Sequence, residues 1–134
     1  MWKNQTNELG LESVFYHSLS NWLRKSKLIL LKETPEEAQY QLIGKIISVD
    51  YPEVSYGGNN EATEIRVRLN ADYSVLDKES GLIIFSSKKT YTENFYQSAD
   101  PSQLLTNKHE ALARIADDIS EEIYFSMIRQ VVRK

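Results

Sequence analysis

Three basic side chains on one predicted sheet surface are the residues most able to do chemistry in this sequence. Arg66 and Arg68 take alternate positions in an apolar–polar repeat, and Lys88 follows on the next apolar segment. Side chains two residues apart point to the same face of a strand, so the set predicts a cationic stripe. Such a stripe can bind phosphate or carboxylate groups. The alternative is ordinary cross-strand pairing with nearby acids, which are Glu64, Asp50 and Asp72.

Other residues that often carry catalysis or bind metals lack the necessary spacing. His17 and His109 are the only two histidines and stand without metal-ligand spacing. The absence of cysteine excludes thiolate ligands and cysteine nucleophiles. The acidic pairs are typical of solvated turns and helix faces: Glu36-Glu37, Asp117-Asp118 and Glu121-Glu122. We expect no metal, no cofactor and no enzyme activity. A hydrolase with two catalytic carboxylates stays an alternative, because carboxylate separation cannot be read from sequence.

The basic set belongs to a long antiparallel hairpin in the middle of the chain. Apolar and polar residues alternate strictly from Thr63 to Val75, which indicates a strand with one buried face. The turn Asp77–Gly81 follows, and a second strand runs from Leu82 to Tyr91. Lys89 falls on the core-facing parity of this second strand, so either its register is uncertain or a bulge intervenes.

An earlier strand, Gln39–Tyr51, is predicted to join this hairpin. The Gly and Asn residues of Tyr56–Asn60 are typical of a turn rather than of a phosphate-binding loop, and the turn makes the three strands an antiparallel meander. The apolar residues of Gln39–Tyr51 occupy both parities, which indicates two partly covered faces or a bulge near Gly44. A brief extended segment at Leu28–Leu31 and a turn at Thr34–Glu37 precede this strand.

Helical periodicity at both ends of the chain supplies a cover for the sheet. Apolar residues recur every three or four positions over Leu9–Lys25 and over Lys108–Val131. Polar residues precede both segments as candidate N-caps: Thr6 or Asn7, and Thr106 or Asn107. Thr92–Thr106 is expected to be an irregular connection. The predicted fold class is α+β, a two-layer sandwich with two amphipathic helices packed on one face of a mainly antiparallel three- to four-stranded sheet.

Length and charge narrow the class of protein further. The chain has 134 residues, so residues 1–134 are expected to form a single domain. Its net charge of −3 does not favour nucleic acid as a partner. No apolar run reaches the length of about 18 residues needed to span a membrane, and no signal peptide is recognisable. We expect the sequence to be a soluble fragment of a longer precursor.

The opening of the chain resembles the lipopolysaccharide-assembly lipoprotein family, LptE. In that family an aromatic strand end leads to an Asn-x-Thr loop and then to a Gly-apolar-Glu helix entry, as in Trp2–Glu12 here. The later order of elements is similar too: an acidic turn with alanine, a long strand, a Gly/Asn turn, two long strands, a Tyr-x-x-x-Phe exit and an acidic, alanine-bearing helix. The matching segments are Glu36–Ala38, Tyr91–Phe95 and Ala111–Ile123.

The resemblance implies a non-catalytic outer-membrane lipoprotein of Gram-negative bacteria that faces the periplasm. Such a protein plugs the LptD β-barrel, helps it assemble, and binds lipopolysaccharide for delivery to the outer leaflet. Contact with the membrane would occur only through a lipid anchor, whose cysteine is absent from this chain. The family fold begins with a strand before the first helix, and this strand is expected to be essentially absent here, ending at Trp2. Its absence would leave an unpaired sheet edge.

The resemblance also adds one candidate ligand residue. Family members bind lipopolysaccharide through basic residues near the turn after the first long strand and near the start of the last helix. Lys108 matches the second region, whereas the first, Tyr56–Asn59, has no arginine. Arg66, Arg68 and Lys88 are expected to compensate. A different periplasmic α+β lipoprotein adaptor, binding a protein or cell-wall ligand, stays the alternative function.

Overall fold

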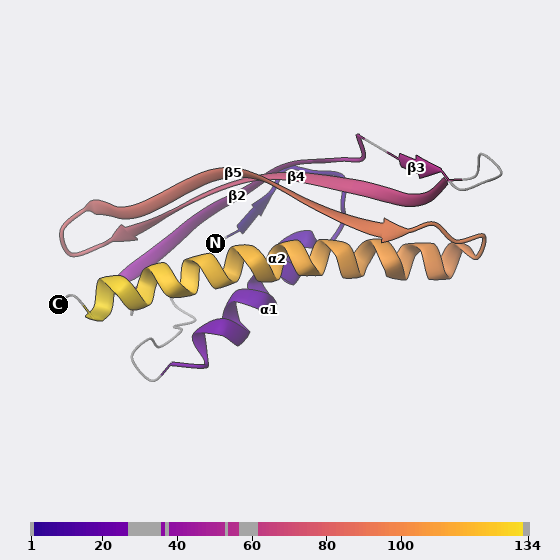
Figure 1. Ribbon diagram of the computed structural model, residues 1–134. Coiled ribbons are helices and arrows are strands. Elements are labelled where there is room, and N and C mark those ends of the chain that lie inside the picture. Colours follow the sequence, from indigo (N-terminus) through magenta and orange to yellow (C-terminus); the bar gives the residue numbers. More distant parts are fainter. Residues whose placement is uncertain (1, 27–35, 37, 53, 57–61, 133–134) are drawn as a thin grey trace.

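The computed structural model describes residues 2–26, 36, 38–52, 54–56 and 62–132 of the chain (Figure 1). Its elements, in chain order, are β1 (Trp2–Asn4), α1 (Leu11–Leu23), β2 (Tyr40–Asp50), β3 (Val54–Tyr56), β4 (Ala62–Asp77), β5 (Leu82–Tyr96) and α2 (Pro101–Val132). The extended segment predicted at Leu28–Leu31 lies outside the described residues. So does the turn at Thr34–Glu37, apart from Glu36.

Strand β4 is the centre of the sheet. It pairs antiparallel with β5 from Glu64 to Asp77 on one edge. On the opposite edge it pairs antiparallel with β2 and, beyond the end of β2, with the short β3. Strand β1 then pairs with β2 in parallel. The helices α1 and α2 lie together on one side of this sheet (Figure 1), which confirms the predicted two-layer α+β fold.

Strand β1 corrects the expectation that the first strand is essentially absent. Trp2, Lys3 and Asn4 are in register with Gly44, Lys45 and Ile46 of β2. The indole of Trp2 is buried and meets the ring of Phe15 with centroids 4.9 Å apart. A Cβ on Gly44 would lie 2.4 Å from the Trp2 Cε3 atom, far below van der Waals contact. Glycine at this position therefore makes room for the indole that holds β1 in place.

The alternation predicted for β4 is confirmed. The odd-numbered residues face the helices and are buried: Val67, Leu69, Ala71, Tyr73 and Val75. The register with β5 runs unbroken through Ala71 opposite Lys89, and the bulge lies further along, beside Leu76. Lys89 therefore does face the helix side. It is tolerated there because β5 is an edge strand and the Lys89 ammonium lies 2.6 Å from Glu122 Oε1 of α2.

The bulge in β2 lies at Ile47 rather than near Gly44. The register with β4 shifts between Ile46 and Ser48. Ile46 is fully buried on the helix side, whereas Ile43, on the opposite parity, is 42% exposed. Beyond the bulge the parity reverses, because one extra residue turns every following side chain to the other face. The mixed apolar pattern of β2 therefore records one bulge and not two covered faces.

Helix α2 begins earlier than its apolar periodicity predicts. It starts at Pro101, and the Ser102 N–H donates to Asp100 Oδ1 at 3.0 Å. Proline at the first helical position behind an aspartate cap is a strong start signal. The prediction that Thr92–Thr106 is irregular is therefore wrong, since β5 continues to Tyr96 and α2 occupies the rest from Pro101. Helix α1 likewise begins after Gly10, whose φ is 78°, rather than at a Thr6 or Asn7 cap.

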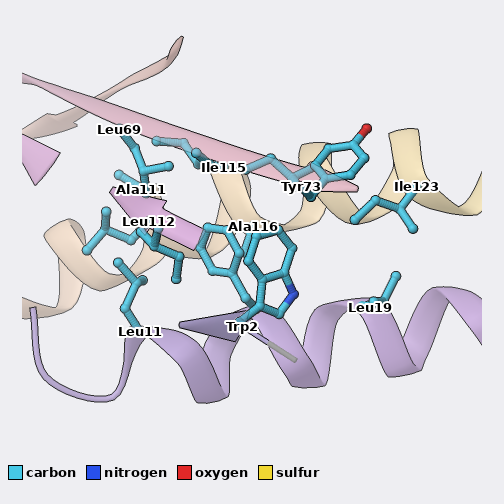
Figure 2. Packing of buried hydrophobic residues seen from close by; sticks show 14 of the residues in the cluster. Trp2, Leu11, Leu19, Leu69, Tyr73, Ala111, Leu112, Ile115, Ala116 and Ile123 are labelled. Carbon is cyan, nitrogen blue, oxygen red and sulfur yellow. The ribbon is translucent and has the colours of Figure 1, made fainter. Parts of the chain in front are cut away.

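The core lies between the helices and the covered face of the sheet. Figure 2 shows Trp2 standing between α1 and the sheet, near Tyr73, with Leu112 and Ala116 of α2 beside it. Helix α2 packs on α1 and on β5, and α1 also packs on β1. Because the small residues Ala111 and Ala116 are fully buried in α2, the helix can approach its neighbours closely.

Candidate ligand-binding surface

The sheet face opposite the helices carries most of the predicted basic set, and we call it the open face. Arg68 of β4 lies opposite Asp50 of β2 in register. Its Nε donates to Asp50 Oδ1 at 3.0 Å and its Nη2 donates to Oδ2 at 2.8 Å. These hydrogen bonds hold the pKa of the Asp50 carboxyl below its usual value. Arg68 is thus already engaged by a carboxylate in a two-pronged arrangement.

A row of polar contacts continues across the open face from this pair. Arg66 Nε donates to Asn94 Oδ1 at 3.4 Å, and Asn94 Nδ2 in turn donates to Glu64 Oε1 at 3.3 Å. One level further along β4, the Asn70 amide donates to Ser48 Oγ at 2.8 Å and accepts from Thr90 Oγ1 at 2.5 Å. Both arginines therefore lie in a hydrogen-bonded polar surface that spans β2, β4 and β5.

Lys88 lies on the same face but further along the sheet. It is in register with Asp72, four residues from Arg68 along β4, a rise of about 13 Å. Lys45 of β2 is opposite the same Asp72 from the other side and is exposed. Sequence reasoning missed Lys45, because the bulge at Ile47 disguises the parity of β2. The open face thus offers a second cationic position, in which two lysines flank one aspartate.

Lys108 is not part of the open face. It extends from α2 in the helix layer, and its ammonium lies 3.0 Å from Glu8 Oε2 in the loop before α1. The Tyr51 hydroxyl donates to Glu8 Oε1 at 2.5 Å. Burial raises the pKa of Glu8, but the hydrogen bonds from Tyr51 and Lys108 outweigh it, and the net shift is downward. This Glu8 junction joins the loop, the end of β2 and α2.

The structure therefore brings together only part of the predicted set. Arg66 and Arg68 are neighbours, Lys88 shares their face at a distance, and Lys108 lies on the other side of the sheet. Alternating with these cations on the open face are the acids Asp50, Glu64 and Asp72. A phosphate-bearing ligand would have to compete with Asp50 for the Arg68 guanidinium.

Within the described part of the chain, the histidines and acidic pairs form no metal-binding group. His17 is exposed on α1 beside the ring of Tyr16. Asp117 accepts from Trp22 Nε1 at 2.7 Å, and Glu122 accepts from Lys89 and Tyr91. Among the residues described, no group of three or more potential ligands is placed to hold a metal ion. Asp117 instead joins α2 to α1, and Glu122 joins α2 to β5.

The Asn-x-Thr loop that begins the chain has a clear structural role. Asn4 Oδ1 accepts from both the backbone N–H and the hydroxyl of Thr6, at 3.0 and 2.6 Å. Asn4 Nδ2 donates to Glu8 O and to Glu12 Oε2. Asn4 therefore folds the loop back on itself and fixes the start of α1 against β1. The motif is structural in this protein and makes no part of the open face.

A two-layer α+β domain with one polar, open sheet face is the class of protein that these features define. A family model described as LptE, lipopolysaccharide-assembly, matches residues 1–127. The chain belongs to this family, which is a non-enzymatic family of lipoproteins that act in lipopolysaccharide transport and outer-membrane assembly. A search of curated proteins found no match.

Solved structures share the fold at low sequence identity. A protein from Caulobacter crescentus superposes with a TM-score of 0.63 and 12% identity, covering 99% of this chain and 92% of that one. The minor lipoprotein from Acinetobacter baumannii gives a TM-score of 0.57 and 13% identity, with 96% and 91% covered. The rare lipoprotein B from Shewanella oneidensis gives 0.55 and 12%, with 98% and 96% covered. Neither described helix of this chain is long and apolar enough to cross a membrane.

Proposed function

We propose that this chain is a non-catalytic subunit that plugs the LptD β-barrel, helps it to assemble and binds lipopolysaccharide on its way to the outer leaflet. The observation that carries the proposal is the family match over residues 1–127. In this proposal residues 1–134 act as one domain on the periplasmic side of the outer membrane, held there by a lipid anchor. No nucleic acid takes part.

The geometry supports a plug in two ways. The helix layer and the covered sheet face share one continuous core, so the domain keeps its shape while a barrel closes around it. The open face is covered with hydrogen-bonded polar and charged groups, which suit contact with a hydrated lumen or with polar head groups. A subunit of this kind acts by its shape and surface, with no chemical step.

Lipopolysaccharide binding is assigned to the basic residues on both sides of the domain. Arg66 and Arg68 offer guanidinium groups to phosphates, and Lys88 adds an exposed ammonium on the same face. Lys108 contributes separately, from α2 in the helix layer. It matches the family's basic region near the start of the last helix. To bind a phosphate, the Arg68 guanidinium releases the Asp50 carboxylate and pairs with the ligand instead.

Co-purification tests the plug. The full-length lipidated precursor would be expressed with its organism's LptD and extracted from outer membranes in mild detergent. We expect a stoichiometric complex that survives gel filtration. Two folded proteins that elute separately would contradict the plug and favour an adaptor for another protein or for a cell-wall ligand.

Lipopolysaccharide retention tests the arginines. Arg66→Ala with Arg68→Ala should reduce the lipopolysaccharide that the purified chain retains by about tenfold, because two phosphate contacts are lost. The matched control is Arg24→Ala with Arg129→Ala, which removes the same charge from exposed positions at the C-terminal ends of α1 and α2. Equal retention by both double variants would remove Arg66 and Arg68 from the site.

A further inference from the structure

The outer edge of β5 carries a row of backbone groups that no described strand covers. Strand β5 pairs with β4 alone, along its inner edge. The Asn94 carbonyl accepts from Arg114 Nη2 of α2 at 3.0 Å, and the Tyr96 carbonyl accepts from Asn107 Nδ2 at 3.0 Å. These two carbonyls therefore point outward, away from β4. Since backbone groups alternate along a strand, every second residue before Asn94 also presents its N–H and C=O outward.

Those residues form a defined window. They are all exposed, and they are Ser86, Lys88, Thr90 and Thr92. At one end the side chains of α2 already satisfy the edge carbonyls, and at the other the bulge next to Leu76 interrupts the ladder. The window thus has the length of one ordinary strand pairing, about seven residues.

The helix flank beside this window carries one arginine followed by two acidic residues. Arg114, Asp118 and Glu122 are spaced four apart on α2, so they form one row. Arg114 reaches Glu93 at 3.5 Å and Glu122 reaches Lys89 at 2.6 Å, which lays the row along β5 with Asp118 between them. Figure 1 shows α2 following β5 over much of its length. Partial burial, then Glu93 and the other carboxylates nearby, raise the pKa of Asp118.

We propose that the β5 edge from Ser86 to Thr92 receives an extended strand of the barrel partner, which adds to the sheet through backbone hydrogen bonds. This inference rests on the proposed function. The charges beside this edge define the incoming strand. Its side chain beside the exposed Lys88 on the open face is acidic, and its side chain beside Asp118 on the helix side is basic.

A second copy of this chain fits the edge poorly. An antiparallel pairing about a twofold axis at the centre of the window sets Lys89 opposite its own copy. It also brings Asp118 and Glu122 of one α2 toward the same two acids of the other copy. Lysines on an edge strand are a common defence against self-pairing. The edge therefore disfavours pairing with a second copy of this chain. It favours a partner strand that carries an acidic side chain on one face and a basic side chain on the other.

Thr90→Pro tests the pairing, with Thr90→Ala as the matched control. Both variants lose the hydroxyl contact with Asn70. Only proline removes the outward N–H, which pairs with no described strand of the isolated chain, so the fold tolerates the change. In co-purification with LptD, we expect Thr90→Pro to bind about tenfold more weakly than Thr90→Ala.

Hydrogen exchange of the unaltered chain gives a second, independent measurement. The amides of Lys88, Thr90 and Thr92 should exchange more slowly in the LptD complex than in the free chain, and this test decides the matter if Thr90→Pro unfolds. Equal binding of both variants together with unchanged exchange would overturn the strand pairing and leave the plug intact. Failure of the unaltered, folded chain to bind LptD would overturn both proposals.

Discussion

The two faces of the sheet follow different physical rules. On the covered face, β4 places fully buried apolar side chains such as Leu69 against two helices. On the open face, the very next residue, Asn70, exchanges hydrogen bonds with Ser48 and Thr90. The covered face determines the fold through burial, whereas the open face carries solvated polar contacts. Burial and solvent contact are therefore separated by one residue along the same strand.

This separation has a consequence for surface variation. Because exposed ion pairs contribute little to stability, the open-face charges can change without loss of the fold. The covered face tolerates fewer substitutions, because a cavity or an added methyl group disturbs the close packing of the core. Two solved structures share this fold at only 12 and 13% sequence identity, which is consistent with that division.

Trp2 and Gly44 offer the largest test of the covered face. Trp2→Ala should lower the free energy of unfolding by about 3 to 5 kcal/mol, because a buried indole is lost. Gly44→Val should cost about 3 kcal/mol by driving the indole out of its place. Since both changes detach the same strand, their combination should cost little more than Trp2→Ala alone. Chemical denaturation measures all three, and full additivity would contradict the contact.

Neighbouring residues of β4 compare the two faces directly. Leu69→Ala should cost about 2 to 5 kcal/mol, as expected for a fully buried leucine. Asn70→Ala should cost about 1 kcal/mol, because the hydroxyl groups that it leaves can bind water. Thermal unfolding of the two variants checks the contrast. Similar losses would mean that the open face contributes to the fold as much as the core does.

The Glu8 junction should respond to pH. Its pKa is lowered in the folded state from a usual value of 4.5, so the ionised form stabilises the fold above that value. This contribution is lost as the pH falls through the folded pKa. Glu8→Gln should therefore be less stable than the unaltered chain by about 1 kcal/mol near neutral pH. The gap should close under acid conditions, and a gap independent of pH would exclude Glu8 ionisation as its cause.

Arg68 and Asp50 should show the smallest effect. Their side chains are 44% and 49% exposed, so solvent screens the pair. A double-mutant cycle with Arg68→Ala and Asp50→Ala should give a small coupling energy that falls further in high salt. A larger coupling would mean that the pair is held for stability, and would weaken its assignment to ligand binding.

The covered face was largely predictable from sequence, because burial imposes a period. The alternation of β4 and the apolar stripe of α2 both appear in the structure as predicted. Helix α2 was placed too late because its first turns face solvent and lack apolar periodicity, although Asp100-Pro101 marked its start. The parity of β2 was not recoverable, since one bulge at Ile47 reverses it.

The open face was less predictable for a physical reason. Solvated charges need no period, so the sequence predicted that Arg66 and Arg68 share a face and offered Glu64, Asp50 and Asp72 as partners, but not which arginine meets which acid. Asp50 became the partner of Arg68 only through the register that the bulge in β2 imposes. The position of Lys45 on the open face was not predicted for the same reason. Lys108 was placed by family resemblance, and local periodicity alone would not have selected it.

Lysine labelling in the presence of lipopolysaccharide tests most directly whether the open face is the binding surface. The purified chain would be treated with an amine-reactive reagent with and without lipopolysaccharide in mild detergent, and modification would be measured at each lysine. We expect protection of Lys45 and Lys88 on the open face, with Lys25 at the end of α1 unchanged. Protection of Lys25 with Lys45 and Lys88 fully reactive would contradict the account.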